Sequence, residues 1–216
     1  MRPLLRRRAA VLLAMCSGAA CLSGCSSFGG GGTPRVASTS PDGGALSLDL
    51  PTRCFTARDG NWADFYLTDL PPEVFHQGAD ASALRGTILH VHMFLNPKAG
   101  RTPLSPSAST CIVRVLVIAD GQIGVYGGGG FMSRGGGVDE ANLTARLRAG
   151  TLELTRATPG FADALGQSVV SGTFSCPRDD REALLISRAM TALAWHAAEV
   201  TPQPLVDVAP PPPAAP

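Results

Sequence analysis

Two histidines separated by a single residue are the side chains with the clearest potential for chemistry. His90 and His92 flank Val91 within an apolar segment, residues 86–96. Alternate residues of a β-strand share a face, so the two imidazoles would stand side by side, about 6 to 7 Å apart at the backbone. Such a pair can share a zinc or copper ion at about 2.0 Å from each nitrogen. The alternative is that both rings are exposed or hydrogen-bonded without a metal.

Asp64 is the residue expected to complete such a site. Residues 62–69 alternate apolar and polar side chains, as a half-buried strand does, and Asp64 and Tyr66 belong to the polar side. If this strand pairs with the histidine strand, Asp64 and Tyr66 point to the same side as the imidazoles. The candidate ligands of a copper or zinc ion are therefore His90, His92 and Asp64.

The histidine segment has a partial likeness to a known metal site. Residues 90–94 are similar to the paired copper histidines of the copper/zinc superoxide dismutase sandwich. The further histidine ligands and the bridging imidazole of that family have no counterpart, because only His76 and His196 remain and neither has the required spacing. We therefore reject dismutase activity. No Gly-x-Ser-x-Gly elbow and no His-Glu-x-x-His occurs either, so the sequence favours a non-catalytic protein.

Residues 1–24 have the three parts of an export signal. Arginines at positions 2, 6, 7 and 8 precede an uncharged apolar stretch, residues 9–20. The stretch Leu22-Ser23-Gly24-Cys25 follows and resembles the lipobox of bacterial lipoproteins. The resemblance covers only the first 25 residues and implies that the chain is cut before Cys25, whose thiol carries a lipid. Ser26 occupies the place where part of that family uses an acidic residue for inner-membrane retention, which favours the outer membrane.

The charge of the mature chain limits its partners. Four of the eighteen basic residues leave with the signal and no acidic residue does, so fourteen basic side chains face seventeen acidic ones. A net charge of about −3 argues against nucleic acid and against a polybasic membrane patch. The expected partners are the membrane, through Cys25, and an envelope protein or polymer on the periplasmic side.

Three cysteines besides Cys25 remain after the signal is removed. They are Cys54, Cys111 and Cys176. In an oxidising envelope two of them could form a disulfide and leave one thiol over, with three pairings open. Nothing in the sequence selects the pair.

The pattern of apolar residues predicts a mainly β domain. Short β-branched and apolar runs alternate with turn signals at residues 62–69, 86–96, 111–119, 122–126, 143–148, 152–156 and 168–176. Hairpin turns are expected at Asp120-Gly121 and around Gly150. Residues 127–137, rich in glycine, are expected to be a mobile loop with Phe131, Met132 and Arg134 as a binding tip. The fold class is an antiparallel β-sandwich or an open barrel.

A single amphipathic helix is expected after the strands. Asp179 and Glu182 have the spacing of an N-terminal cap, and the apolar positions that follow fall on one helical face. The chain thus divides into a signal peptide (1–24), a flexible tether (25–44), a β domain (45–178), a helix packed on that domain (179–200) and a proline-rich disordered tail (201–216).

Three functions fit these features. The leading hypothesis is a membrane-anchored envelope lipoprotein whose non-catalytic β domain binds or supports another envelope component. The alternative is a periplasmic copper- or zinc-binding protein that uses His90 and His92. A third is a carrier of a small apolar ligand inside an open barrel.

Overall fold

The structure, a computed structural model, describes residues 33–40, 44–77, 84–98 and 108–200. The expected signal peptide, Cys25 and the tail 201–216 lie outside this part of the chain. The strands are β1 (Arg35–Ser38), β2 (Ala45–Ser47), β3 (Thr52–Ala57), β4 (Ala63–Thr68), β5 (Gly86–Met93), β6 (Cys111–Ala119), β7 (Gln122–Gly135), β8 (Asn142–Ala157), β9 (Ser168–Pro177) and β10 (Ala198–Glu199), and the helices are α1 (Glu73–Gln77) and α2 (Asp180–Trp195).

The strands form one antiparallel meander. From β3 to β9 each strand is hydrogen-bonded to the next one in the sequence, β1 and β2 continue the sheet beyond β9, and β10 pairs with β8. The expected tight turn between β6 and β7 is present, with positive φ angles at Asp120 (52°) and Gly121 (75°). The mainly β, antiparallel fold with one C-terminal helix is therefore confirmed.

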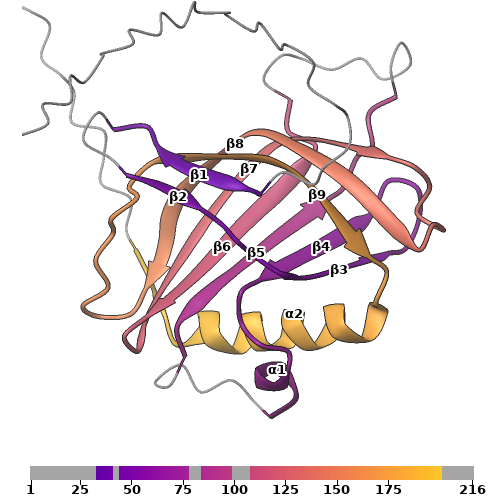
Figure 1. Cartoon of the computed structure of the whole chain (residues 1–216). Coiled ribbons are helices and arrows are strands. Elements are labelled where there is room, and N and C mark those ends of the chain that lie inside the picture. Colours follow the sequence, from indigo (N-terminus) through magenta and orange to yellow (C-terminus); the bar gives the residue numbers. More distant parts are fainter. Residues whose placement is uncertain (1–32, 41–43, 78–83, 99–107, 201–216) are drawn as a thin grey trace, which may run out of the picture. The chain divides into compact units, whose positions relative to one another are not determined.

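The sheet curls into a half-barrel (Figure 1). Phe65 of β4 and Phe174 of β9, which are far apart in the strand order, have ring centroids only 5.6 Å apart. Phe55 of β3 forms an isolated parallel bridge with Arg178, just after β9, and its carbonyl accepts a hydrogen bond from the Asp179 N–H at 3.1 Å. An odd number of strands lies between β3 and β9 in the antiparallel sheet, so β3 and β9 run in the same direction.

Each face of the sheet has its own apolar cluster. The concave face holds buried side chains that include Phe55, Phe65, Leu89, Val91, Met93, Val113, Val115, Tyr126 and Phe174. The outer face packs against α1 and α2 through a second cluster that includes Tyr66, Phe75, Ile88, Leu116, Ile123, Ile186, Met190 and Leu193. Core side chains thus fill the concave face, and α1 and α2 lie against the outer face of the sheet.

The glycine-rich segment is a strand and not the expected mobile loop. Residues 127–130 lie in the middle of β7 and pair with β6 along their whole length. A Cβ atom on Gly128 would lie 1.8 Å from the Thr151 carbonyl oxygen, and one on Gly130 would lie 2.6 Å from the Gly150 Cα. Gly128 and Gly130 are therefore explained by the close approach of the β8 backbone.

The hairpin expected around Gly150 is also wrong, because β8 runs through it without reversing. The pairing of β8 with both neighbours shifts register near this point. Ala149 has a φ of +46°, a conformation that is common in turns. Here it produces a β-bulge at a corner of the half-barrel, where an extra residue bends the strand.

Two predicted segments have different limits in the structure. Part of the expected tether, Arg35–Ser38, is strand β1, which is hydrogen-bonded to β9 and to β2. Helix α2 begins at the expected cap, where the Asp179 carboxylate accepts from the Arg181 and Glu182 N–H groups. It ends at Trp195 and not at Val200, since β10 pairs with Arg156 and Ala157, at the end of β8 beyond the residues that pair with β9.

Candidate ligand groove on the outer face

Strand register places the candidate residues on one face of the sheet. Asp64 is the cross-strand partner of His92, and Tyr66 is the partner of His90. His90 is in turn opposite Arg114, and Arg114 is opposite Gly127. The outward side of β4 to β7 therefore holds these groups in two adjacent rows, as alternation along each strand requires.

Asp64 binds both histidines through the same oxygen. His90 Nε2 and His92 Nδ1 each lie 2.8 Å from Asp64 Oδ1. Burial raises the pKa of Asp64, but the hydrogen bonds from His90 and His92 outweigh burial and hold it below its usual value of 3.8. The carboxylate is therefore ionised and accepts from two ring N–H groups.

Aromatic contacts fix the two imidazole rings further. The His90 ring is stacked on Tyr66 with centroids 4.6 Å apart, and the His92 ring meets the edge of Trp62 at 4.7 Å. Burial is the main cause that raises the pKa of Tyr66, and a hydrogen bond with Ser187 of α2 opposes it. Tyr66 thus joins the histidine pair to the helix.

The expected metal site receives its three candidate side chains in one place. The structure brings His90, His92 and Asp64 together as the sequence predicted, but the ring nitrogens nearest Asp64 are directed at its carboxylate. Among the described residues, no group of three or more His, Cys, Asp or Glu side chains has an arrangement that could hold a metal ion. Copper or zinc binding stays a prediction, and the hydrogen-bonded cluster has a sufficient explanation without it.

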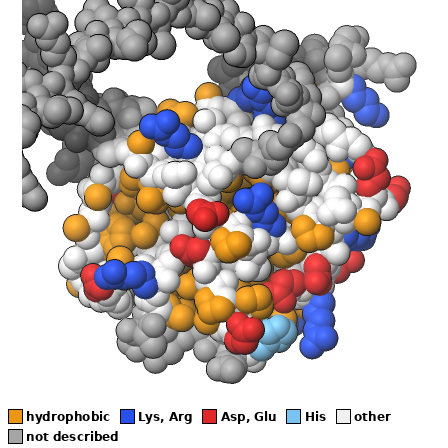
Figure 2. Space-filling view, in the orientation of Figure 1, with side chains coloured by type: hydrophobic (Ala, Val, Ile, Leu, Met, Phe, Trp, Pro, Cys, Tyr) orange, Lys and Arg blue, Asp and Glu red, His pale blue; other side chains and the backbone are white. Residues whose placement is uncertain are grey.

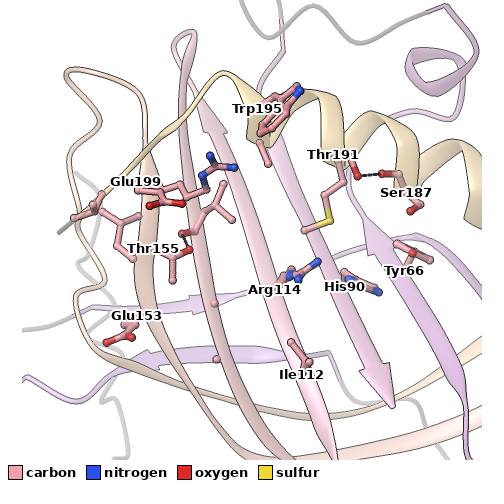
Figure 3. Close-up of a pocket in the computed structure, with 18 residues that line it drawn as sticks. Tyr66, His90, Ile112, Arg114, Glu153, Thr155, Ser187, Thr191, Trp195 and Glu199 are labelled. Carbon is pink, nitrogen blue, oxygen red and sulfur yellow. Dashed lines mark hydrogen bonds between the residues drawn. The ribbon is translucent and has the colours of Figure 1, made fainter. Parts of the chain in front are cut away.

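A groove of about 820 Å³ lies between this face and helix α2. Its floor is the outward face of β4 to β8, and its walls are α2 and the segment that contains β10. The lining residues are Tyr66, His90, Ile112, Arg114, Val125, Gly127, Gly128, Glu153, Leu154, Thr155, Arg156, Ser187, Met190, Thr191, Ala194, Trp195, Glu199 and Val200. Figure 3 shows Arg114 and His90 side by side on the floor, with Trp195 and Thr191 on the helix above them.

Apolar side chains in the groove are unusually accessible. Trp195 is 79% exposed and Ile112 is 41% exposed, although both are large and hydrophobic. The Arg156 guanidinium lies 5.8 Å from the Trp195 ring centroid, and its buried Nε has no hydrogen-bond partner among the described residues. Figure 2 shows a face of the molecule on which hydrophobic side chains are exposed among arginines and acidic residues. Large apolar side chains that are exposed in the lining of one groove, as Trp195 and Ile112 are, are typical of a binding site.

A smaller cavity of about 310 Å³ lies on the other side of Tyr66. Its lining includes Trp62, Asp64, Leu184 and Ser187. Tyr66 and Ser187 border both cavities, so they separate the larger groove from the one that Asp64 faces.

The three cysteines are buried free thiols, so the expected disulfide is not formed in this structure. Cys111 and Cys176 belong to the concave cluster and Cys54 belongs to the cluster under α2. Burial raises the pKa of each thiol from 9.0 to about 12. Their environments are those of packing residues, which are inert as nucleophiles.

The expected binding tip is not formed by the residues that the sequence suggested. Met132 is fully buried in the core. Arg134 donates hydrogen bonds to the carbonyl oxygens of Gly60 (2.8 Å) and Gly136. These side chains hold the end of β7 in place.

Sequence reasoning missed Arg114 and Trp195 as groove residues. Arg114 occupies an ordinary exposed position in a strand, and Trp195 lies at the end of an amphipathic helix. The one available signal was a tryptophan on the polar side of that helix. A large aromatic side chain is uncommon on a polar helix face and is typical of a binding surface.

Comparisons with known protein families, with curated proteins and with solved structures find no match to this chain. In the part of the chain that the structure describes, no helix is both long enough and apolar enough to cross a membrane. The geometry of the groove is therefore the basis for the functional argument.

Proposed function

We propose that this protein is a lipid-anchored lipoprotein of the bacterial cell envelope whose β domain binds an envelope ligand in the groove beneath α2 without transforming it. The single observation that supports the binding role is the open groove of about 820 Å³ with Trp195 exposed on its wall. Its volume is within the range of about 300 to 1,000 Å³ that ligand pockets usually have.

The composition of the groove favours binding over catalysis. Met190, Ala194 and Val125 supply apolar surface, and some of the polar groups of the lining are held by other contacts. For example, the Thr191 hydroxyl donates to the Ser187 carbonyl oxygen at 2.9 Å. An apolar cleft with a few polar groups that set orientation is the usual composition of a small-molecule site.

The anchor is proposed from the sequence of residues 22–25, which resembles a lipobox. Acyl chains on Cys25 would hold the domain at a membrane surface that faces the periplasm, with the outer membrane favoured by Ser26. Two or more chains are needed for stable attachment, because a single chain binds only marginally. The ligand would then come from the membrane or from its immediate surroundings.

One experiment tests both parts of the proposal. Cys25→Ser should move the protein from the membrane fraction to the soluble fraction. The soluble variant should bind the neutral apolar dye Nile red, and Trp195→Ala should weaken that binding by roughly tenfold, as loss of a large aromatic anchor does. Leu184→Ala is the matched control, because Leu184 is also an exposed apolar residue of α2 (50%) but lines the smaller cavity. Membrane retention of Cys25→Ser would refute the anchor, and equal effects of the two α2 variants would refute the groove.

A further inference from the structure

We propose that the groove takes a single-chain amphiphile with one carboxylate head, bound with the head at Arg114 and the chain directed toward Trp195. This inference rests on the proposed binding function and names the class of ligand. It depends on the charge distribution in the groove, on the register around Arg114 and on the position of the exposed apolar side chains.

Arg114 is a cation without a carboxylate partner in the described part of the chain. No hydrogen bond or ion pair to its guanidinium is present there, and the ion pairs of that part involve other residues. Asp64, an acidic residue of the same face, already accepts from His90 and His92. The guanidinium is thus available for an external anion.

The neighbours of Arg114 in its row do not pair with its guanidinium. On one side lies His90, and on the other side lies Gly127, which has no side chain. A Cβ atom on Gly127 would lie 3.1 Å from Thr155 Cγ2, so the Thr155 side chain covers Gly127. The next residue in the row is Glu153 on β8, two strands from Arg114 and roughly 10 Å away at the backbone. An anion would therefore reach the guanidinium from the open side of the groove.

The number of charges in the groove fits a head group with one negative charge. Arg156, the other arginine of the lining, is held against the Trp195 ring. Glu153 and Glu199 lie toward the opposite end of the groove in Figure 3, where they would repel a second anionic group. A single guanidinium presents two parallel N–H donors, a geometry that matches one carboxylate.

The apolar part of the ligand has a continuous path away from Arg114. Met190, Ala194 and Trp195 form the helical wall on one side of Arg114, whereas Ile112 lies two residues along β6 on the other side. Trp195 is more exposed than large apolar residues usually are, and an acyl chain along the helical wall would cover it. The Arg114 guanidinium and the apolar side chains of α2 thus correspond to the two parts of an amphiphile.

The test uses the soluble Cys25→Ser protein and its own fluorescence. The chain has two tryptophans, so Trp62→Phe leaves Trp195 as the only one. Titration with dodecanoate and dodecyl phosphate below their micelle concentrations, and with dodecanol below its solubility limit, gives three dissociation constants from Trp195 emission. We expect dodecanoate to bind about tenfold more tightly than dodecanol, as a charge-assisted hydrogen bond implies.

Arg114→Gln should remove this preference by lowering the affinity for dodecanoate to about that for dodecanol. Arg146→Gln is the matched control, because Arg146 is another exposed strand arginine but is outside the groove lining. Equal affinities for dodecanoate and dodecanol in the parent protein, or tighter binding of dodecyl phosphate, would overturn the carboxylate assignment while the binding function stands. Failure of all three compounds and of Nile red to bind would instead overturn the proposed function.

Discussion

The carboxylate of Asp64 holds both histidine rings of the outer face, and each ring has an aromatic neighbour that limits its rotation. Asp64 Oδ1 accepts from His90 and His92 at 2.8 Å, while Tyr66 and Trp62 contact the rings. The side chain of Asp64 is only 25% exposed, so its hydrogen bonds compete with little water. The cluster therefore connects β4 to β5 beside helix α2.

Removal of the Asp64 carboxylate should destabilise the protein. Asp64→Ala leaves two partly buried ring N–H groups without an acceptor, so we expect a loss of about 1.5 to 3 kcal/mol in the free energy of unfolding.

Asp64→Asn should lower the free energy of unfolding by less than Asp64→Ala, because the amide oxygen still accepts. The folded pKa of Asp64 is lowered from 3.8, so the advantage of the native residue over Asn is present above pH 3.8 and is lost as the pH falls through the folded value. Urea unfolding at several pH values measures this, and a pH-independent difference would contradict it.

The same cluster gives a test for metal binding. Because Asp64 already receives hydrogen bonds from both rings, equimolar Zn²⁺ or Cu²⁺ should leave the melting temperature unchanged. Thermal unfolding with and without each ion is the measurement, with the His90→Ala/His92→Ala double variant as the control. A rise in melting temperature that the double variant loses would support the metal-binding alternative instead.

At the scale of elements, the glycines of β7 allow β8 to cross close to it at the corner of the half-barrel. A Cβ atom on Gly128 would lie 1.8 Å from the Thr151 carbonyl oxygen, which is backbone and cannot rotate away. The bulge at Ala149 bends β8 into this position. The corner in turn places Glu153 and Thr155 along the groove.

Gly128→Ala should therefore be strongly destabilising. We expect a loss of about 3 kcal/mol or more, because the backbone of β7 or β8 must shift to relieve the contact. Gly135→Ala is the matched control, since it lies in the same strand and a Cβ atom there meets nothing within 4 Å. Denaturant midpoints of the two variants should differ clearly, and similar midpoints would show that the corner is not tightly packed.

At the scale of the whole molecule, three buried thiols make stability depend on alkaline pH. Burial raises the pKa of Cys54, Cys111 and Cys176 from 9.0 to about 12. A raised pKa means that the folded state keeps the proton longer than the unfolded state. The stabilisation is complete below pH 9.0 and is lost as the pH rises toward 12.

The free energy of unfolding should accordingly fall above pH 9.0, by up to about 1.4 kcal/mol per pH unit for each thiol. Urea unfolding at about pH 8 and at about pH 10.5 checks this under reducing conditions. A thiol reagent at pH 8 should react only after denaturant is added. Immediate reaction of the native protein would contradict the burial of the three cysteines.

The sequence alone determined features that depend on neighbours along the chain. Alternation with a period of two placed Asp64 and Tyr66 on one side of their strand and His90 and His92 on one side of theirs, and the Asp179 side chain marked the start of α2. These features follow from local backbone geometry, so a few consecutive residues suffice to predict them.

Only the tertiary structure decided how those elements meet. The glycine run was expected to be a loop, and the segment around Gly150 a hairpin, because glycine has the same local preferences in a loop, a turn or a crowded strand. What distinguishes these cases is the contact of Gly128 with Thr151, far away along the chain. The groove likewise depends on Trp195 of α2 lying over Arg114 of β6, and no local pattern relates residues so distant in sequence.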